Sequence, residues 1–133
     1  MKPLLLSLLF LFYFTHIKSQ GNSVAVKADS ITIDSLKDLA WKVSRKDAAY
    51  SLTILKKMEG VQQAKHTNYR LDVLYYYYGI IYKNLGNFNQ SEIYLNKYEA
   101  FHSKTKKVPY LLTVSIAKAN LYSDEGFMGI KAW

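Results

Sequence analysis

The sequence predicts an all-α fold, and three observations support this prediction. No segment of the 133 residues shows the strict alternation of apolar and polar residues that marks a half-buried strand. Apolar residues instead recur at helical spacing in five segments. Glycine, proline or helix-capping residues separate most of these segments.

Residues 1–19 have the pattern of a secretory signal peptide. Lys2 precedes an apolar run, Leu4–Phe14, and Ser19 offers a small residue for cleavage before Gln20. The run is shorter than the roughly 20 residues of a membrane span, although an uncleaved anchor is the alternative. We therefore expect an exported protein, periplasmic or secreted, with no transmembrane span after cleavage. The chain has no cysteine, so neither lipid attachment through cysteine nor a disulfide is available.

Residues 20–32 are polar and are predicted to form a flexible leader to a domain that spans 33–133. Ser35 and Asp38 fit a capping box, which predicts that the first helix begins there. Its expected buried face consists of Leu36, Leu39, Ala40 and Val43.

A second helix is predicted to begin at Asp47, a good N-cap residue, and to end near Gly60. Its inward residues would be Leu52, Leu55 and Met58, and residues 61–68 would form a polar connector.

The third and fourth helices are expected at about 69–85 and 89–102, joined by a turn at Gly86–Asn87. The apolar stripe of the third comprises Leu71, Leu74 or Tyr75, Tyr78, Tyr82 and Leu85. The fourth would bury Ser91, Tyr94 or Leu95, Tyr98 and Phe101.

A charged loop, 103–109, ends at Pro109, a residue favoured at the start of a helix. The fifth helix is predicted over about 110–124, and Gly126 would mark another turn. Its expected buried residues are Leu112, Ile116, Ala119 and Tyr122.

Three marks recur along the chain: a small residue, an apolar residue three later and a turn residue four after that. They appear as Ala40, Val43 and Asp47, as Gly79, Tyr82 and Gly86, and as Ala119, Tyr122 and Gly126. The small residues are 39 and 40 positions apart, a period typical of stacked helix hairpins. Each would allow two helices to approach closely, and the alanines at 40 and 119 predict that Gly79→Ala is mild.

The segment Tyr75–Phe88 resembles the first helix and turn of a tetratricopeptide (TPR) repeat. Its departures from that pattern are Tyr75, Tyr78, Ser91 and a period above the usual ~34 residues. The resemblance implies a right-handed stack of antiparallel helix hairpins, a TPR-like solenoid of about two and a half repeats. The longer repeats resemble exported TPR segments that precede bacterial sensor kinases and transcription regulators.

The resemblance also implies a groove lined by the first helix of each hairpin, binding a protein or peptide partner. Carried onto this sequence, the groove residues are Lys37, Trp41, Ser44, Arg45, Tyr76, Ile80, Lys83, Asn84, Ile116, Asn120, Ser123 and Asp124. A solvated face is the alternative. Within the run Tyr75–Tyr78, we expect Tyr75 and Tyr78 in the core and Tyr77 against a neighbouring helix, while a sugar-binding patch is the alternative.

Catalysis is not expected from this sequence. His66 and His102 lack a second ligand at metal-binding spacing, and no glycine loop could cradle a phosphate. We expect no catalytic residue, no metal and no cofactor. Removing Lys2 and Lys18 with the leader lowers the formal net charge from +8 to +6, but the basic residues are scattered, so nucleic acid is not expected as a partner.

The sequence therefore favours an exported, non-catalytic scaffold, which would serve as the input segment of a larger signalling protein. A helical glycan-binding protein of the cell envelope is the alternative. A repeat offset of 40 would place the sixth helix at about 129–142, beyond Trp133. We thus expect a domain truncated at its C-terminus, able to self-associate through the unfinished repeat.

Overall fold

The computed structural model describes residues 27–131, with side chains described as far as residue 126. The predicted signal peptide, 1–19, and residues 20–26 of the predicted leader lie outside the described residues. The chain divides into two compact units, residues 1–32 and 33–133. In the smaller unit, residues 27–32 are helical, and the Thr32 hydroxyl donates to the carbonyl of Ala28 at 3.0 Å. This part of the predicted leader is therefore helical.

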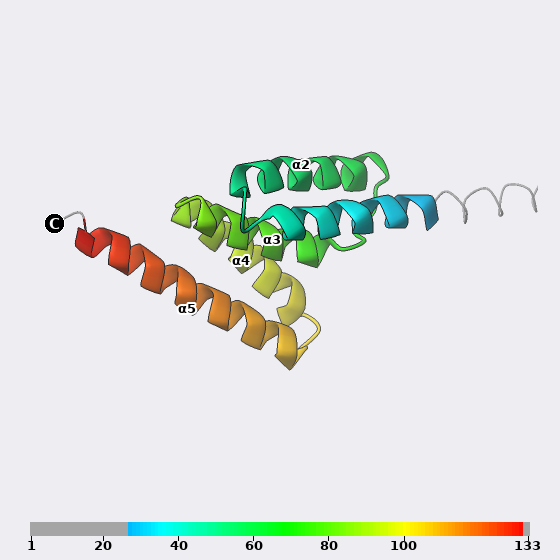
Figure 1. The fold of residues 1–133 in the computed structure, drawn as a ribbon. Helices are drawn as coiled ribbons and strands as arrows, with labels where there is room; N and C mark the ends of the chain where they lie inside the picture. The colour runs from blue at the N-terminus through cyan, green and yellow to red at the C-terminus, as the bar shows by residue number, and fades with distance from the viewer. Residues whose placement is uncertain (1–26, 132–133) are drawn as a thin grey trace, which may run out of the picture. The chain divides into compact units, whose positions relative to one another are not determined.

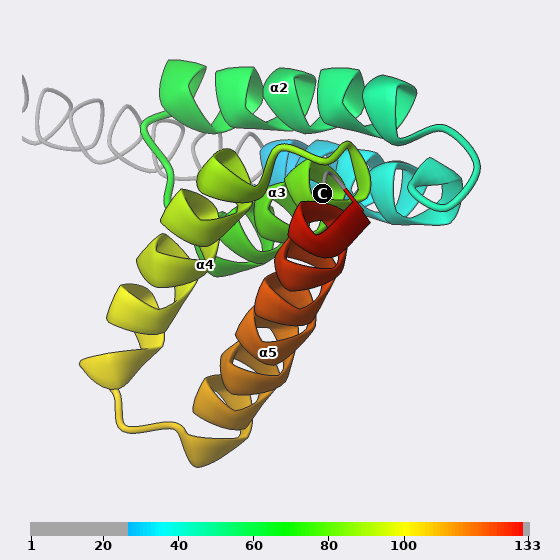
Figure 2. The ribbon, with the colours of Figure 1, turned by 90° about the vertical axis from the view of Figure 1, so that its left-hand side faces the viewer.

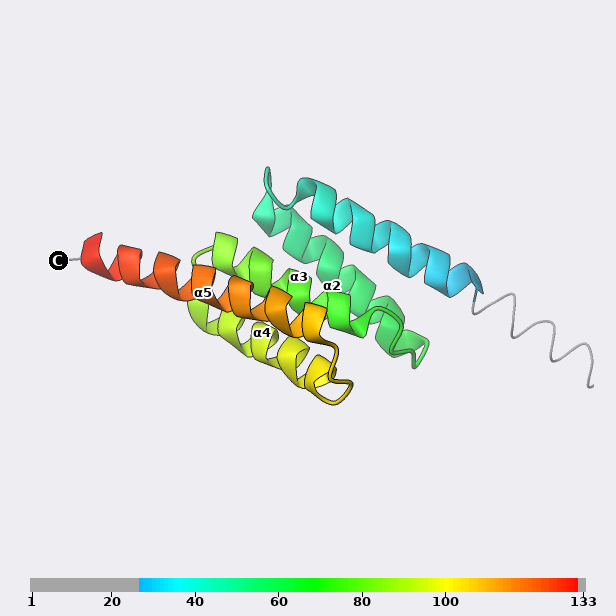
Figure 3. The same cartoon turned by 90° about the horizontal axis from the view of Figure 1, so that it is seen from below.

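The fold is all-α, as predicted, and residues 27–131 contain no strand. A helical segment, residues 27–43, is followed by four helices whose bounds are α2 (Ala48–Ala64), α3 (Leu71–Asn84), α4 (Phe88–Ser103) and α5 (Val108–Lys131) (Figure 1). Within the larger unit, α2 packs on α3, α3 on α4, and α4 on α5. Figures 2 and 3 both show α4 and α5 lying side by side.

Two helix pairs with short connections organise the larger unit. We call residues 33–43 with α2 the first hairpin, and α3 with α4 the second hairpin. Asp47 caps α2 as predicted, because its Oδ1 accepts the Tyr50 amide at 2.8 Å. Asn87 caps α4 in the same way, and Gly86 makes the predicted turn before it with φ +75°.

Both hairpins are closed by the same contact. The Ser51 hydroxyl donates to the carbonyl of Ala40 at 2.7 Å, and the Ser91 hydroxyl donates to that of Gly79 at 2.6 Å. Both serines are fully buried. The recurring small residue thus accepts a hydroxyl from the facing helix, in addition to permitting close approach.

Two clusters of buried side chains hold these helices together. The first cluster joins the first hairpin to α3 and comprises Ile33, Ala40, Ile54, Leu55, Met58, Leu74, Tyr78 and Ile81. The second joins α4 to α5 and comprises Leu95, Tyr98, Val114, Ala117 and Leu121.

Several predicted boundaries were wrong. Ser35 lies inside a helix that is already formed at residue 27, so its capping box does not start the helix. Gly60 does not end α2, which continues to Ala64 and takes in the first part of the predicted 61–68 connector. Gly126 lies within α5, because the helix continues to Lys131 without a positive-φ turn.

The predicted buried face of the fifth helix was also wrong. All four of its residues, Leu112, Ile116, Ala119 and Tyr122, are exposed. The buried residues of α5 are instead Val114, Ala117 and Leu121, which pack on α4. Both sides of this helix are apolar, so periodicity alone does not tell which side meets the preceding helix. In α4, similarly, His102 is buried and Phe101 is 37% exposed.

Candidate binding surface

An exposed aromatic stack lies between the first hairpin and α3. The Trp41 ring stacks on that of Tyr77, with centroids 4.8 Å apart and planes at 26°. Trp41 is 43% exposed, whereas Tyr77 is partly buried against the first cluster, as predicted for its packing on a neighbouring helix. Burial raises the pKa of Tyr77, which the charge of Lys37 partly opposes. The stack therefore presents an indole on a supported, neutral phenol.

Lys37 lies on the same helix as Trp41, one turn earlier, and is held by two acids. Its Nζ is 3.2 Å from Asp38 and 3.4 Å from Asp34. Burial acts to lower the pKa of Lys37, but its hydrogen bonds to Asp38 and Asp34 outweigh this and raise the pKa. The ammonium therefore stays charged at the edge of the aromatic stack.

Asp34 ties the first hairpin to the segment that leads into α3. Its carboxylate accepts hydrogen bonds from the Tyr69 hydroxyl at 2.8 Å and from Arg70 Nε at 3.1 Å. Burial opposes ionisation, but these bonds and that of Lys37 lower the pKa of Asp34. Arg70 adopts φ +59° at the N-cap of α3, so this pairing also holds an uncommon backbone conformation. This link was not predicted from the sequence, because the partners of Asp34 are far from it in the chain and leave no local signal.

The predicted groove residues of the second and third repeats meet at one ion pair. Lys83 Nζ on α3 lies 2.9 Å from Asp124 Oδ2 on α5. Two other residues of this set, Tyr76 and Ile80, pack against the second cluster, and the Tyr76 ring lies 5.3 Å from that of Tyr98. Tyr76 therefore contributes to packing between helices.

The remaining predicted residues are distributed as follows. Ser44 is buried, and its hydroxyl donates to the carbonyl of Trp41 at 2.8 Å. Exposed side chains are those of Arg45, Asn84, Ile116, Asn120 and Ser123. The structure thus links the helical segment 27–43 to α3 through Trp41 and Tyr77, and α3 to α5 through Lys83 and Asp124.

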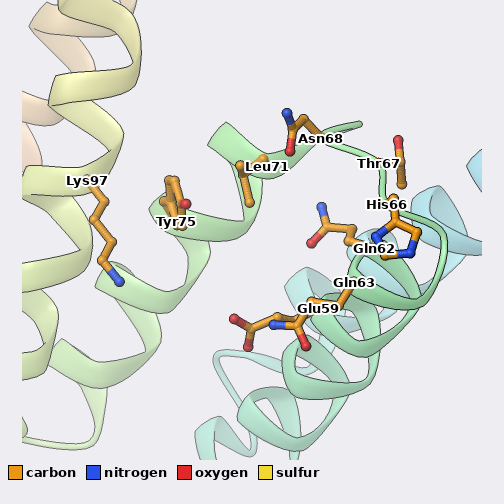
Figure 4. Close-up of a pocket in the computed structure, with 9 residues that line it drawn as sticks. All are labelled: Glu59, Gln62, Gln63, His66, Thr67, Asn68, Leu71, Tyr75 and Lys97. Carbon is orange, nitrogen blue, oxygen red and sulfur yellow. The ribbon is translucent and has the colours of Figure 1, made fainter.

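A second surface, absent from the sequence predictions, is an open pocket of about 530 Å³. It is lined by Glu59, Gln62, Gln63, His66, Thr67, Asn68, Leu71, Tyr75 and Lys97 (Figure 4). Figure 4 shows Lys97 on α4 and the Glu59 side chain on α2 at different walls. These residues come from three helices and a connector, so sequence spacing could not bring them together.

Several polar groups of this pocket have partners, although Gln62 Oε1 is buried without one among the described residues. Glu59 accepts the Tyr78 hydroxyl at 2.8 Å, and Gln62 Nε2 donates to the carbonyl of Tyr69 at 2.8 Å. Lys97 Nζ lies 4.6 Å from the ring centroid of Tyr94 and 5.7 Å from that of Tyr75. These side chains therefore already hold α2 against α3 and its connector, and Lys97 against tyrosine rings of α3 and α4.

No protein-family model, curated protein or solved structure matches this chain. Within residues 27–131, none of the helices combines the length and the hydropathy that a bilayer span requires. The same part of the chain holds no group of three His, Asp or Glu side chains placed to bind a metal ion.

Proposed function

We propose that this chain is a non-catalytic, exported scaffold with a TPR-like stack of hairpins. A peptide or protein partner would bind along the face formed by the first helix of each hairpin. The partner would contact Trp41 and the side chains around it, and no cofactor would take part.

The repeated hairpin closure supports the TPR-like part of this proposal. Ser51 with Ala40 and Ser91 with Gly79 make the same buried contact about one repeat apart. A chain built from such units exposes the first helices in series, which gives an extended binding face.

The observation that carries the proposed binding function is the exposed stack of Trp41 on Tyr77. Tryptophan and arginine dominate the energy of many protein interfaces, and an exposed Arg45 lies one turn after Trp41. Because the ring of Tyr77 stacks on the Trp41 indole and restricts its motion, little side-chain entropy is lost when a partner covers the indole.

The test is selection of peptides from a displayed random library on the immobilised full chain. Selected peptides should lose about tenfold or more in affinity for Trp41→Ala, a loss of about 1.4 kcal/mol or more. Tyr50→Ala is the matched control, because Tyr50 is a similarly exposed aromatic residue on α2. Its affinity for the same peptides should stay unchanged.

Two results would contradict the proposal. One is a library that yields no peptide sensitive to Trp41→Ala. The other is binding on a glycan array that is lost with Trp41→Ala, which would assign the aromatic stack to sugar recognition.

A further inference from the structure

The pocket between α2, α3 and α4 contains a buried hydrogen-bond acceptor that has no donor. Gln62 is 3% exposed, and its Nε2 donates to the carbonyl of Tyr69. No donor among the described residues bonds to its Oε1. Figure 4 shows this oxygen turned away from Asn68, toward the space that Glu59 and Tyr75 border. Because a buried acceptor without a partner costs free energy, this position favours a molecule that brings a hydrogen-bond donor.

Two opposite charges border the same space from different helices. The Glu59 carboxylate on α2 accepts the Tyr78 hydroxyl through Oε2 and points toward the wall that carries Lys97 (Figure 4). Lys97 on α4 is exposed, and its Nζ lies 5.7 Å from the ring centroid of Tyr75. Within the described part of the chain, neither Glu59 nor Lys97 belongs to an ion pair. The pocket therefore has acceptors on one wall and a cation on the other.

These groups match the charges of a small zwitterion. An ammonium group has three N–H donors, enough to bond both Gln62 Oε1 and the carboxylate of Glu59. A carboxylate would pair with Lys97 at the opposite wall. The volume of about 530 Å³ suits a small molecule, and Leu71 and Tyr75 supply apolar surface for its side chain. A neutral sugar would leave both charges without a partner, so it fits these walls less well.

We propose that this pocket binds a free α-amino acid, with its ammonium group at Glu59 and Gln62 and its carboxylate at Lys97. The pocket-lining residues include none of the twelve predicted groove residues and neither ring of the Trp41 stack. The site is therefore separate from the proposed peptide-binding surface and does not depend on it. An amino acid bound there would join the first hairpin to α4 through its two charged groups.

The probe is a panel of the twenty L-amino acids, each titrated into the full chain by isothermal titration calorimetry. At least one of them should bind with a stoichiometry of about one. Its amide, which lacks the carboxylate, and its N-acetyl derivative, which lacks the ammonium group, should each bind about tenfold or more weakly. These two derivatives also represent the two ends of a peptide, so they distinguish a free amino acid from a chain terminus.

Glu59→Gln and Lys97→Gln should each weaken binding of that amino acid by about tenfold or more. Glu59→Gln keeps an oxygen that can accept the Tyr78 hydroxyl, so the variant should fold. Lys104→Gln is the matched control, because Lys104 is an exposed lysine at the C-cap of α4 and does not line the pocket. It should change the affinity less than about threefold, and so should Trp41→Ala.

The proposal is overturned if no amino acid of the panel binds, or if the N-acetyl derivative binds as well as the free amino acid. It is also overturned if Lys104→Gln weakens binding as much as Lys97→Gln, or if Trp41→Ala abolishes it, because the amino acid would then bind elsewhere. Binding of a neutral sugar that is lost with Glu59→Gln, with no amino acid bound, would assign the pocket to sugar recognition instead.

Discussion

At the scale of single residues, glycines in helices of this chain have opposite roles. Gly79 is buried, and an added Cβ would lie 2.7 Å from Leu95 Cδ2 and 2.8 Å from its Cγ. Gly60 lies in α2 with no atom within 4 Å of such a Cβ. The first is therefore required by packing, whereas the second only lowers helix propensity.

Gly79→Ala should destabilise the protein by about 1–3 kcal/mol, because Leu95 is fully buried and its Cγ cannot move away freely. This replaces the expectation, drawn from the alanines at 40 and 119, that the change is mild. Gly79→Leu should cost more. Gly60→Ala is the control and should stabilise by about 0.5–1 kcal/mol. Urea denaturation measures all three, and equal midpoints for Gly79→Ala and the parent would refute the tight contact.

Local signals predicted some helix boundaries and missed others, since Ser35, Gly60 and Gly126 neither start nor end a helix. Asp47 as a cap and Gly86 as a turn were correct because each depends on its immediate neighbours. Asp34 was not recognised as a link, because its partners Tyr69 and Arg70 are about 35 residues away in the sequence. The positions of the twelve predicted groove residues depend on the same long-range packing, so Tyr76 turned out to be partly buried against another helix.

At the scale of helices, each second helix joins its hairpin to the next segment. Gln62, eleven residues after Ser51, donates to the carbonyl of Tyr69 in the connector before α3. His102, eleven after Ser91, lies 3.1 Å from Asp72 Oδ2 and stacks on Tyr110 of α5, with ring centroids 4.2 Å apart. In both cases one polar position on the second helix contacts the segment that follows its hairpin.

Ser91→Ala should cost about 0.5–1.5 kcal/mol, because it removes the buried bond that sets the register of α4 on α3. The control is Ser103→Ala, since Ser103 is exposed and its hydroxyl bonds only to Ala100, three residues earlier in the same helix. Thermal melts should separate the two variants. A loss of stability for Ser103→Ala as large as that for Ser91→Ala would show that the closing bond has no special weight.

At the scale of the whole molecule, buried tyrosines make stability sensitive to alkaline pH. Burial, with a smaller effect of the Asp72 charge, raises the pKa of Tyr98 to about 12, and burial also raises that of Tyr78. A tyrosine in the unfolded chain ionises near pH 10. The folded state holds the proton more tightly, so the stabilisation is complete below pH 10 and is lost as the pH rises from 10 toward 12.

The urea concentration at the unfolding midpoint should therefore be lower at pH 11 than at pH 8. Each such tyrosine would lower the free energy of unfolding by at most about 1.4 kcal/mol per pH unit above 10. Tyr98→Phe should reduce this dependence, whereas the exposed control Tyr50→Phe should not. An unchanged dependence for Tyr98→Phe would mean that Tyr98 ionises equally in both states.

The packing of the larger unit is one-sided at α5. This helix contacts α4 through Val114, Ala117 and Leu121, while Leu112 and Ile116 are exposed to solvent. By contrast, α3 packs against α2, α4 and α5. Segments with fewer buried contacts open at lower free energy than the segments that unfold only globally.

Amide hydrogen exchange should therefore be slowest in α3 and faster along α5, most clearly after Asp124, where Gly126 has no neighbouring atom within 4 Å of an added Cβ. Equal protection in α3 and α5 of a proven monomer would be incompatible with this account.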